Sequence, residues 1–377
     1  MRVYVAGVGM TAFGKRPDLE VEDLGRRAAL AALQDAGWEG RIPDEVFCGS
    51  SYSGLLIGQR IMRDLGMTGI PITNVENACS GGATALREAV TAIAAGRADS
   101  ALAIGVEKLS ALGGGVLPLP RTDVDAQQGM TMPAVYAMRA QRYLLETDAT
   151  PEHFAKVAMK SRSNGVNNPY AQFRKAVSVG EGLSSRMVAD PLTLLMCCPT
   201  GDGAAAVLVT NGKGAGRKRP RVRVDSSVLT SGEFVASFRN MAFSGLTERT
   251  ARLAFEQAGL GPADIDVTEL HDAFASAEMM YCEALGYCEP GAAHRLVDSG
   301  ATSIMGANPV NPSGGLLSRG HPVAATGLAQ ICEATWQLRG EAGARQVTSP
   351  RAALTHCTGG GISGLDHGAC AIHVLTI

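Results

Sequence analysis

The sequence predicts an α/β protein built from two similar halves, and three observations support this prediction. Helical and strand-like segments alternate along the 377 residues, which is the pattern of α/β folds. Residues 24–37 are repeated at 246–259, with identities that include Leu24/Leu246, Arg27/Arg249 and Gly37/Gly259. The chain is also long enough for about two domains or two fused half-domains. A repeated α/β unit therefore accounts for both the pattern and the length.

The first half begins with a strand-like run at residues 1–5. An amphipathic helix follows over 24–37 and stops at Gly37, and a turn with Pro and Asp leads into a short strand at 46–48. A β-rich stretch ending near Val75 then turns into an Ala-rich helix, and 101–104 has the composition of the next strand. The expected order is strand, helix, strand, then a second helix and strand.

The second half repeats this order. It contains a helix at 246–259, a strand at 267–270, a helix at 323–338 and a strand at 352–354. We place the division in the Gly-, Lys- and Arg-rich segment 211–220. The N-terminal half is then 1–111 with 196–212, and the C-terminal half is 213–377.

One long segment, 112–195, has no counterpart in the second half. It contains three successive glycines, several prolines and a methionine-rich patch. Long excursions between repeated elements are usually functional. We expect this inserted loop domain to cover the substrate site.

The composition excludes several classes of protein. Hydrophobic residues make up 46% and charged residues 19% of the chain, and the formal net charge is −2, so nothing favours binding to nucleic acid or to acidic membranes. No apolar run is long enough to span a membrane, and the N-terminus is typical of a strand and not of a signal peptide. Nine cysteines without a CxxC pair favour reduced thiols and no metal site. We expect a cytoplasmic enzyme.

A glycine pattern near the N-terminus resembles a dinucleotide-binding motif. Residues 7–12 match G-x-G-x-x-A, but Phe13-Gly14-Lys15-Arg16-Pro17 interrupts the helix that must follow. No acidic residue stands at the expected distance. We therefore expect no permanently bound cofactor.

The strongest chemical signal is Cys79, which lies where the β-rich stretch turns into a helix. Unpaired backbone N–H groups and the helix dipole favour an anion there, so we expect a stabilised thiolate and a good nucleophile. His271, His321 and Cys357 each lie beside a turn residue or at the end of an apolar run. We expect both imidazoles to point at Cys79, because the two halves bring their strand ends together.

The remaining cysteines and histidines are expected to be structural. Cys197 and Cys198 should pack against the strand 204–209. Four histidines are interpreted as structural or exposed: His153, His294, His367 and His373.

Ordered motifs along nearly the whole chain carry a family resemblance. They are Leu65-Gly66-Met67-Thr68-Gly69-Ile70-Pro71, Val166-Asn167-Asn168-Pro169-Tyr170, Cys197-Cys198-Pro199-Thr200 and Asn311-Pro312-Ser313-Gly314-Gly315 before Gly320-His321-Pro322. With these motifs the chain resembles the sterol-carrier-protein type of thiolase, without the C-terminal sterol carrier domain. The resemblance implies the thiolase fold, with two βαβαβαββ halves in five α-β-α-β-α layers. It also implies a homodimer or a dimer of dimers, with coenzyme A as co-substrate.

The resemblance implies a role for each site residue. Cys79 would attack the keto carbon of a 3-oxoacyl-CoA, and His321 would take the thiol proton and help to hold an oxyanion. His271 stands where other thiolases carry Asn and would donate a hydrogen bond to the enolate or thioester oxygen. The backbone N–H groups of Cys79 and Gly359 would form a second oxyanion hole.

Two positions depart from the family pattern. Sterol-carrier-type thiolases usually read His-Asp-Cys-Phe, in which the cysteine moves the α-proton, whereas this chain has Ala273 there. The run His356-Cys357-Thr358-Gly359 instead matches other thiolases, so we expect Cys357 to be the acid/base. Ala324 replaces a usual Gly, which places the turn geometry beside His321 in question.

Two functions remain open. The first is a CoA-dependent thiolase that cleaves or forms 3-oxoacyl-CoA by Claisen chemistry. The alternative is a thiolase-fold retro-aldolase or scaffold subunit that works with a small zinc-ribbon/OB-fold partner on acyl-CoA. The presence of both Cys79 and Cys357 favours the first, because a lyase has no use for an acyl-cysteine.

Overall fold

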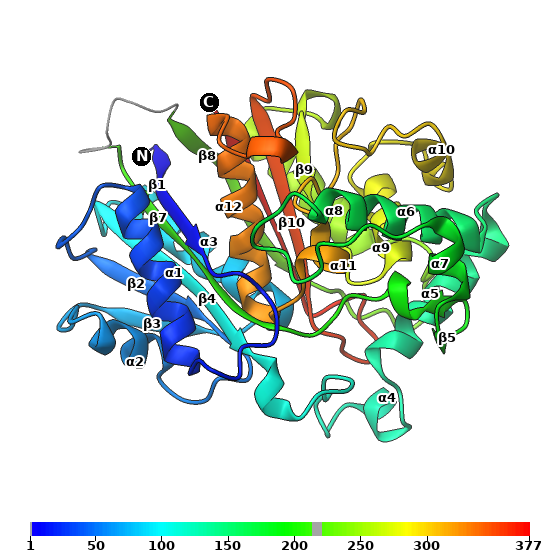
Figure 1. Cartoon of the computed structure of the whole chain (residues 1–377), viewed down its shortest axis with the longest axis horizontal. Helices are drawn as coiled ribbons and strands as arrows, with labels where there is room; N and C mark the ends of the chain where they lie inside the picture. The colour runs from blue at the N-terminus through cyan, green and yellow to red at the C-terminus, as the bar shows by residue number, and fades with distance from the viewer. Residues whose placement is uncertain (1, 213–220) are drawn as a thin grey trace.

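The computed structural model describes residues 2–212 and 221–377 (Figure 1). Most of the predicted dividing segment, 213–220, lies outside the described residues. The first half has the expected βαβαβαββ order. Its elements are β1 (Val3–Met10), α1 (Val21–Asp35), β2 (Glu45–Gly49), α2 (Ile57–Asp64), β3 (Ile72–Val75), α3 (Gly81–Ala94), β4 (Ser100–Lys108) and β7 (Asp202–Thr210).

The second half follows the same plan with one strand almost lost. Its elements are β8 (Val222–Ser231), α8 (Gly245–Ala258), β9 (Val267–Glu269), α9 (Ala275–Ala284), α10 (Ala293–Asp298), α11 (Gly315–Arg319), α12 (Thr326–Arg339), β10 (Ala352–Gly359) and β11 (Ala369–Thr376). The counterpart of β3 is a single parallel bridge between Thr268 and Val310. Pro309 and Pro312 flank that bridge and have no N–H to continue a ladder.

The strands form one sheet whose two halves mirror each other. The order is β3-β2-β4-β7-β1-β8-β11-β10-β9, and β1 pairs with β8 in antiparallel fashion through Val3–Val5 and Val222–Val224. In each half two parallel strands, β2 with β3 and β9 with β10, have their carboxyl ends side by side. The segment with Cys79 follows β3 and the segment with His271 follows β9, so both begin at these carboxyl ends.

Alternation along the strands explains the layers. In β4, Ala101 and Ala103 pack toward a central core, whereas Leu102 and Ile104 pack on the opposite face with α1 and α2. The central core also contains apolar side chains of α3, α12 and strands from both halves, while α8 and α9 cover the outer face of the second half. The two halves of the nine-stranded sheet therefore enclose α3 and α12, and further helices cover each outer face, which is the layering that the family resemblance implies.

The segment between β4 and β7 packs onto the second half. It contains α4 (Val124–Gln127), α5 (Met132–Glu146), α6 (Pro151–Gly165), α7 (Val179–Ser184), β5 (Met187–Ala189) and β6 (Leu192–Thr193). The side-chain amides of Asn164 and Asn168 donate to the backbone oxygens of Asn311 and Ser313 at 3.0 and 2.8 Å. The insertion therefore supports the loop that leads to His321.

One packing prediction was wrong. Cys197 and Cys198 do not pack against 204–209 but against the start of α9, where the Cys198 N–H donates to Ala273 O at 2.9 Å and Cys197 bridges to Phe274. Both faces of β7 are already covered by the central core and by α1, which leaves no room there. Of the helices within 2–212 and 221–377, none combines the length and apolar character that a membrane crossing requires.

Candidate active site

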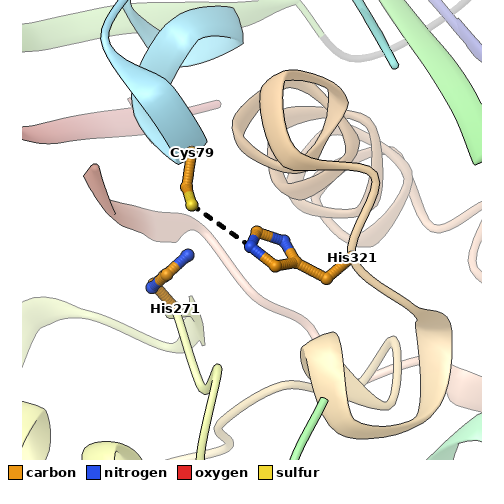
Figure 2. A group of neighbouring side chains, drawn as sticks. All are labelled: Cys79, His271 and His321. Carbon is orange, nitrogen blue, oxygen red and sulfur yellow. Dashed lines mark hydrogen bonds between the residues drawn. The ribbon is translucent and has the colours of Figure 1, made fainter. Parts of the chain in front are cut away.

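Cys79 lies in a short 3-10 turn, Ala78–Ser80, between β3 and α3 (Figure 2). Ala78 has φ 47°, a left-handed conformation that costs energy for a residue with a Cβ and is found at functional turns. A Cβ on Gly82 would lie 2.3 Å from the backbone oxygen of Ala324. Glycine at this position therefore lets the start of α3 contact the turn that follows His321.

His321 forms a hydrogen-bonded pair with Cys79. Its Nε2 lies 3.2 Å from the Cys79 sulfur, and its Nδ1 lies 2.7 Å from Thr326 Oγ1. The Thr326 hydroxyl donates to Pro322 O, so the Thr326 oxygen accepts a hydrogen bond from His321 Nδ1–H. The lone pair of Nε2 consequently faces the thiol, as a proton acceptor requires.

The thiol is not ionised at neutral pH, contrary to the prediction from its helix-start position. Burial raises the pKa of Cys79 to about 12, although backbone hydrogen bonds from Gly360 and from its own N–H lower it. Burial also lowers the pKa of His321 to about 3. Desolvation outweighs the helix start, so Cys79 and His321 are a neutral pair that must transfer a proton when substrate binds.

His271 lies beside His321 and faces the same sulfur. Figure 2 shows its ring and that of His321 pointing at Cys79, and their ring centres lie 5.1 Å apart. The Nδ1 atom lies 3.1 Å from Thr358 Oγ1, and the buried Nε2 has no hydrogen-bond partner among the described residues. The candidate ligand atoms of Cys79, His271 and His321 lie within 4.8 Å of one another, close enough to share a metal ion. The structure thus brings three of the four predicted side chains together.

Cys357 lies in β10 next to the backbone of Cys79. Its sulfur is 3.1 Å from the backbone oxygen of Cys79, and its side chain packs against Ala83 and Ala371. Burial raises its pKa well above the usual value. Cys357 is therefore a protonated thiol that donates to the nucleophile's own backbone.

A backbone donor at the Cys79 sulfur is Gly360, the residue after Gly359. Gly359 is the last residue of β10 and pairs with Ala369, whereas Gly360 leaves the ladder with φ 68°. The backbone hydrogen bond that lowers the pKa of Cys79 comes from Gly360. Gly359 is needed for space, because a Cβ there would lie 2.1 Å from Asn77 O.

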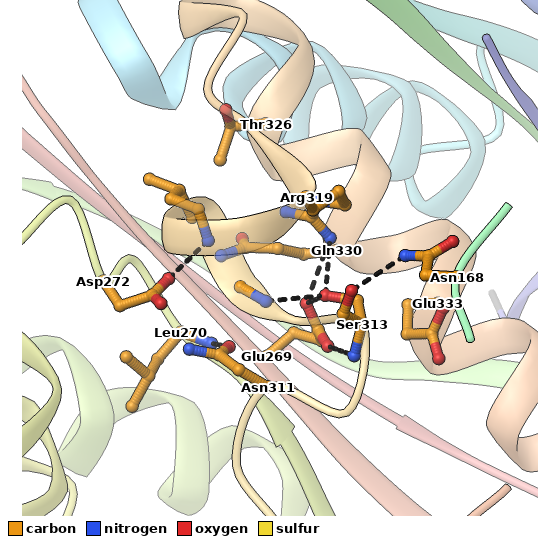
Figure 3. A network of polar contacts seen from close by, with 12 residues as sticks. Asn168, Glu269, Leu270, Asp272, Asn311, Ser313, Arg319, Thr326, Gln330 and Glu333 are labelled. Atoms are coloured by element: carbon orange, nitrogen blue, oxygen red, sulfur yellow. Dashed lines mark hydrogen bonds and ion pairs between the residues drawn. The ribbon is translucent and has the colours of Figure 1, made fainter. Parts of the chain in front are cut away.

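A buried polar network behind His321 was missed by the sequence analysis (Figure 3). Arg319 Nη1 lies 3.0 Å from Glu269 Oε2, and both side chains are 1% exposed. Ser313 donates from its N–H and Oγ to the same carboxylate at 3.0 and 2.7 Å. Glu269 and Arg319 each stand two residues before a site histidine, which is the signal that could have drawn attention to them.

Glu107 at the end of β4 supports the site from the first half. Its buried carboxylate accepts hydrogen bonds from the loop after β2, including the Tyr52 N–H at 2.9 Å, and from the Ala324 N–H at 3.3 Å. Ala324 lies in a right-handed 3-10 turn, Val323–Ala325, where a Cβ is accommodated. The Ala at this position therefore leaves the turn beside His321 intact.

The fold and site together define a class of enzyme in which a buried cysteine nucleophile with a histidine base transfers an acyl group. Two family models match the chain: "Thiolase, N-terminal domain" over residues 3–213 and "Thiolase C-terminal domain-like" over residues 229–367. The chain belongs to the thiolase family.

Relatives of known name agree with this assignment. The chain is 42% identical to "Benzoylsuccinyl-CoA thiolase subunit BbsB" of Thauera aromatica, covering 96% of this chain and 95% of that protein. It is 41% identical to "Acetyl-CoA acetyltransferase" of Methanothermobacter thermautotrophicus, covering 99% of each. It is 40% identical to human "Sterol carrier protein 2", of which it covers 70%. The chain is a CoA-dependent thiolase and an acyltransferase.

Two solved structures share the fold. The structure named "Ltp2-ChsH2(DUF35) aldolase" superposes with a TM-score of 0.85 at 24% identity, covering 99% of this chain and 97% of that one. Human mitochondrial 3-ketoacyl-CoA thiolase superposes with a TM-score of 0.74 at 16% identity, covering 100% and 98%. At these identities the likeness concerns the fold alone.

Proposed function

We propose that this thiolase cleaves or forms 3-oxoacyl-CoA through an acyl-cysteine on Cys79. The observation that carries the proposal is the 3.2 Å contact between the Cys79 sulfur and His321 Nε2, with His271 facing the same sulfur. A partly buried thiol with a pKa of about 12 needs a base in contact, and His321 has its lone pair directed at it. This is the arrangement of an activated nucleophile.

In cleavage, His321 Nε2 takes the thiol proton as the sulfur attacks the keto carbon. The tetrahedral oxyanion then accepts hydrogen bonds from the new His321 Nε2–H and from backbone N–H groups at Cys79 and Gly359. The carbon–carbon bond breaks, the acyl group stays on sulfur, and the electron pair goes to the enolate of the shorter thioester. That enolate takes a proton at its α-carbon, and the thiol of coenzyme A finally removes the acyl group.

Two groups beside Cys79 can move the α-proton. The resemblance assigns this role to Cys357, whose sulfur donates to Cys79 O at 3.1 Å. The other is the imidazole of His271, whose Nε2 has no partner among the described residues. The family assignment as an oxyanion donor requires that His271 carry its proton on Nε2.

Partners, assembly and location are further parts of the proposal. The name of the Thauera relative includes the word "subunit", and the name of the aldolase structure includes a DUF35 protein. These names support a separate small partner, which we propose is a zinc-ribbon/OB-fold protein. The proposal further includes a homodimer or dimer of dimers, as the family resemblance implies, and a location in the cytoplasm. We also propose the division into halves 1–111 with 196–212 and 213–377, with 112–195 as the cover of the substrate site.

Mass spectrometry of the intact protein tests the acyl-enzyme. After incubation with a panel of acyl-CoA and 3-oxoacyl-CoA esters, the wild type should gain the mass of one acyl group, mapped to Cys79. Cys79→Ser should gain none, and Cys197→Ser, a matched change at another partly buried cysteine, should behave as the wild type. An adduct on another cysteine would contradict the assignment, and cleavage of a 3-hydroxyacyl-CoA without any adduct would favour the retro-aldolase.

A further inference from the structure

Three side chains from distant parts of the chain direct metal-ligand atoms at one small volume. The Cys79 sulfur, one nitrogen of His271 and one nitrogen of His321 lie within 4.8 Å of one another, and Figure 2 shows the three side chains converging. No other group of three histidine, cysteine or acidic residues within 2–212 and 221–377 meets in this way. The sequence favoured no metal site, because spacing along the chain does not bring positions 79, 271 and 321 together.

Each imidazole is held from behind by a threonine, which leaves Nε2 for a ligand. His321 Nδ1 lies 2.7 Å from Thr326 Oγ1, and His271 Nδ1 lies 3.1 Å from Thr358 Oγ1. Metal-binding histidines almost always have their second nitrogen in a hydrogen bond of this kind, which fixes the orientation of the ring.

The second imidazole also has a polar atom that lacks a partner. His271 is 3% exposed, and its Nε2 has no hydrogen-bond partner among the described residues. A buried polar atom without a partner is costly and needs an explanation, such as a water or an ion at that point. An ion bonded to Nε2 would satisfy it.

The distances suit a tetrahedral zinc ion. Bonds of about 2.3 Å to sulfur and about 2.0–2.1 Å to nitrogen place the ligand atoms of such a site about 3.3–3.6 Å apart. The Cys79 sulfur and His321 Nε2, at 3.2 Å, need to separate by a few tenths of an ångström. The other pairs, at no more than 4.8 Å, need to approach by at most about 1.5 Å, which side-chain rotation can supply.

The donor set determines the class of metal. One thiolate and two imidazoles suit zinc, whereas Mg²⁺ and Ca²⁺ take oxygen ligands. Three protein ligands leave the fourth position of the tetrahedron open to water. The bonds to the ion would use the lone pairs of the sulfur and of His321 Nε2, which are the same lone pairs that acyl transfer needs.

We propose that Cys79, His271 and His321 bind one Zn²⁺ ion, and that the bound ion reversibly inhibits the thiolase. The thiol loses its proton to solvent as the zinc–sulfur bond forms, and nothing is oxidised or reduced. Each imidazole bonds to the ion through Nε2 and has its proton on Nδ1. Zinc and an acyl group exclude each other on the sulfur. The metal site stands on the geometry alone, whereas the inhibition rests on the proposed function.

Cobalt(II), a coloured substitute for zinc, measures binding without any activity. Chelator-treated wild type should bind one Co²⁺ per chain with a thiolate-to-cobalt charge-transfer band in the near ultraviolet, and added Zn²⁺ should remove the band. Cys79→Ser should lack the band. His271→Asn loses one ligand and should bind at least about 10–100-fold more weakly, since even the loss of an outer partner costs that much.

The control is His294→Asn, a change at a histidine whose Nδ1 contacts Gly291 O and which does not belong to the group. It should bind cobalt as the wild type does, and far-UV circular dichroism should show that all variants are folded. A wild type without the band, a band that survives in Cys79→Ser, or wild-type affinity in His271→Asn would overturn the metal site.

A second pair of variants tests the support behind His321. Thr326→Val removes the oxygen beside Nδ1 and should weaken cobalt binding about 10–100-fold. Thr335→Val is the matched control, because this buried threonine of α12 has a hydroxyl without a partner among the described residues. Equal affinities in the two variants would overturn the role of Thr326 in the site.

Acylation in the presence of zinc tests the inhibition. Zn²⁺ should slow the gain of an acyl group by wild type in mass spectrometry, a chelator should restore it, and protein acylated beforehand should show no cobalt band. An unchanged rate of acylation with the site filled would overturn the inhibition. If the wild type acquires no acyl group even without zinc, the proposed function fails, and the cobalt spectrum still decides whether the site binds a metal.

Discussion

Replacing Glu269 by Gln should destabilise the protein strongly, because it leaves Arg319 charged and unpaired in the core. The ion pair has an N···O distance of 3.0 Å, and each side chain is only 1% exposed. Removing one partner of such a pair costs about 3–5 kcal/mol, since the remaining charge loses its counter-ion without regaining water. We therefore expect Glu269→Gln to lower the free energy of unfolding by about that amount.

The reverse change should cost less. Arg319→Met leaves Glu269 with two hydrogen bonds from Ser313. Burial already raises the pKa of Glu269 to about 7, so the carboxyl can take up a proton when the Arg319 charge is removed. The double variant has no unpaired charge, and its cost should be well below the sum of the two single changes.

Urea unfolding of the four proteins at pH 7.5, followed by far-UV circular dichroism, provides the measurement. The control is Glu256→Gln, which breaks an ion pair with Arg252 whose two side chains are both 61% exposed and should change stability by no more than about 1 kcal/mol. A cost for Glu269→Gln similar to that control, or additive costs in the double variant, would refute the argument from desolvation.

Three further outcomes are expected. Burial lowers the pKa of His321 and of His356 to about 3, so below the unfolded pKa of about 6.5 the unfolded chain binds more protons than the folded one. Each histidine should therefore reduce the free energy of unfolding by about 1.4 kcal/mol per pH unit as the pH falls from 6.5 toward 3. Urea midpoints that do not change between pH 7 and 5 would contradict this. Thr326→Val should lower the thiolysis rate about tenfold or more, because His321 Nδ1–H loses its acceptor and an unpaired buried donor costs about 1–3 kcal/mol; a wild-type rate would show that Thr326 does not hold the tautomer. Gly82→Ala should destabilise the protein by about 1–3 kcal/mol and slow acylation, because its Cβ would lie 2.3 Å from Ala324 O; unchanged thermal unfolding and acylation would contradict the close packing of this turn.

The amino-acid sequence by itself determined the fold class and the thiolase family. Repeated helix and strand signals predicted the alternation of strands and helices in each half, because hydrophobic periodicity and turn residues act locally. The full βαβαβαββ order was implied by the family resemblance. The same local signals placed Cys79 at the turn before α3 and identified the two histidines that the structure brings beside it. The lost third strand of the second half was missed, although its prolines were visible.

Only the tertiary structure decided how these groups are protonated. The sequence predicted a thiolate at Cys79, but desolvation by the surrounding protein keeps the thiol neutral. The Cys79 sulfur and His321 Nε2, which lie 3.2 Å apart, belong to residues 242 positions apart in the chain. The desolvation of a group and the hydrogen bonds it makes depend on all its neighbours in space, and many of these neighbours belong to distant segments of the chain. A local pattern can name the reactive residues, whereas the packing around them sets which atoms hold the protons.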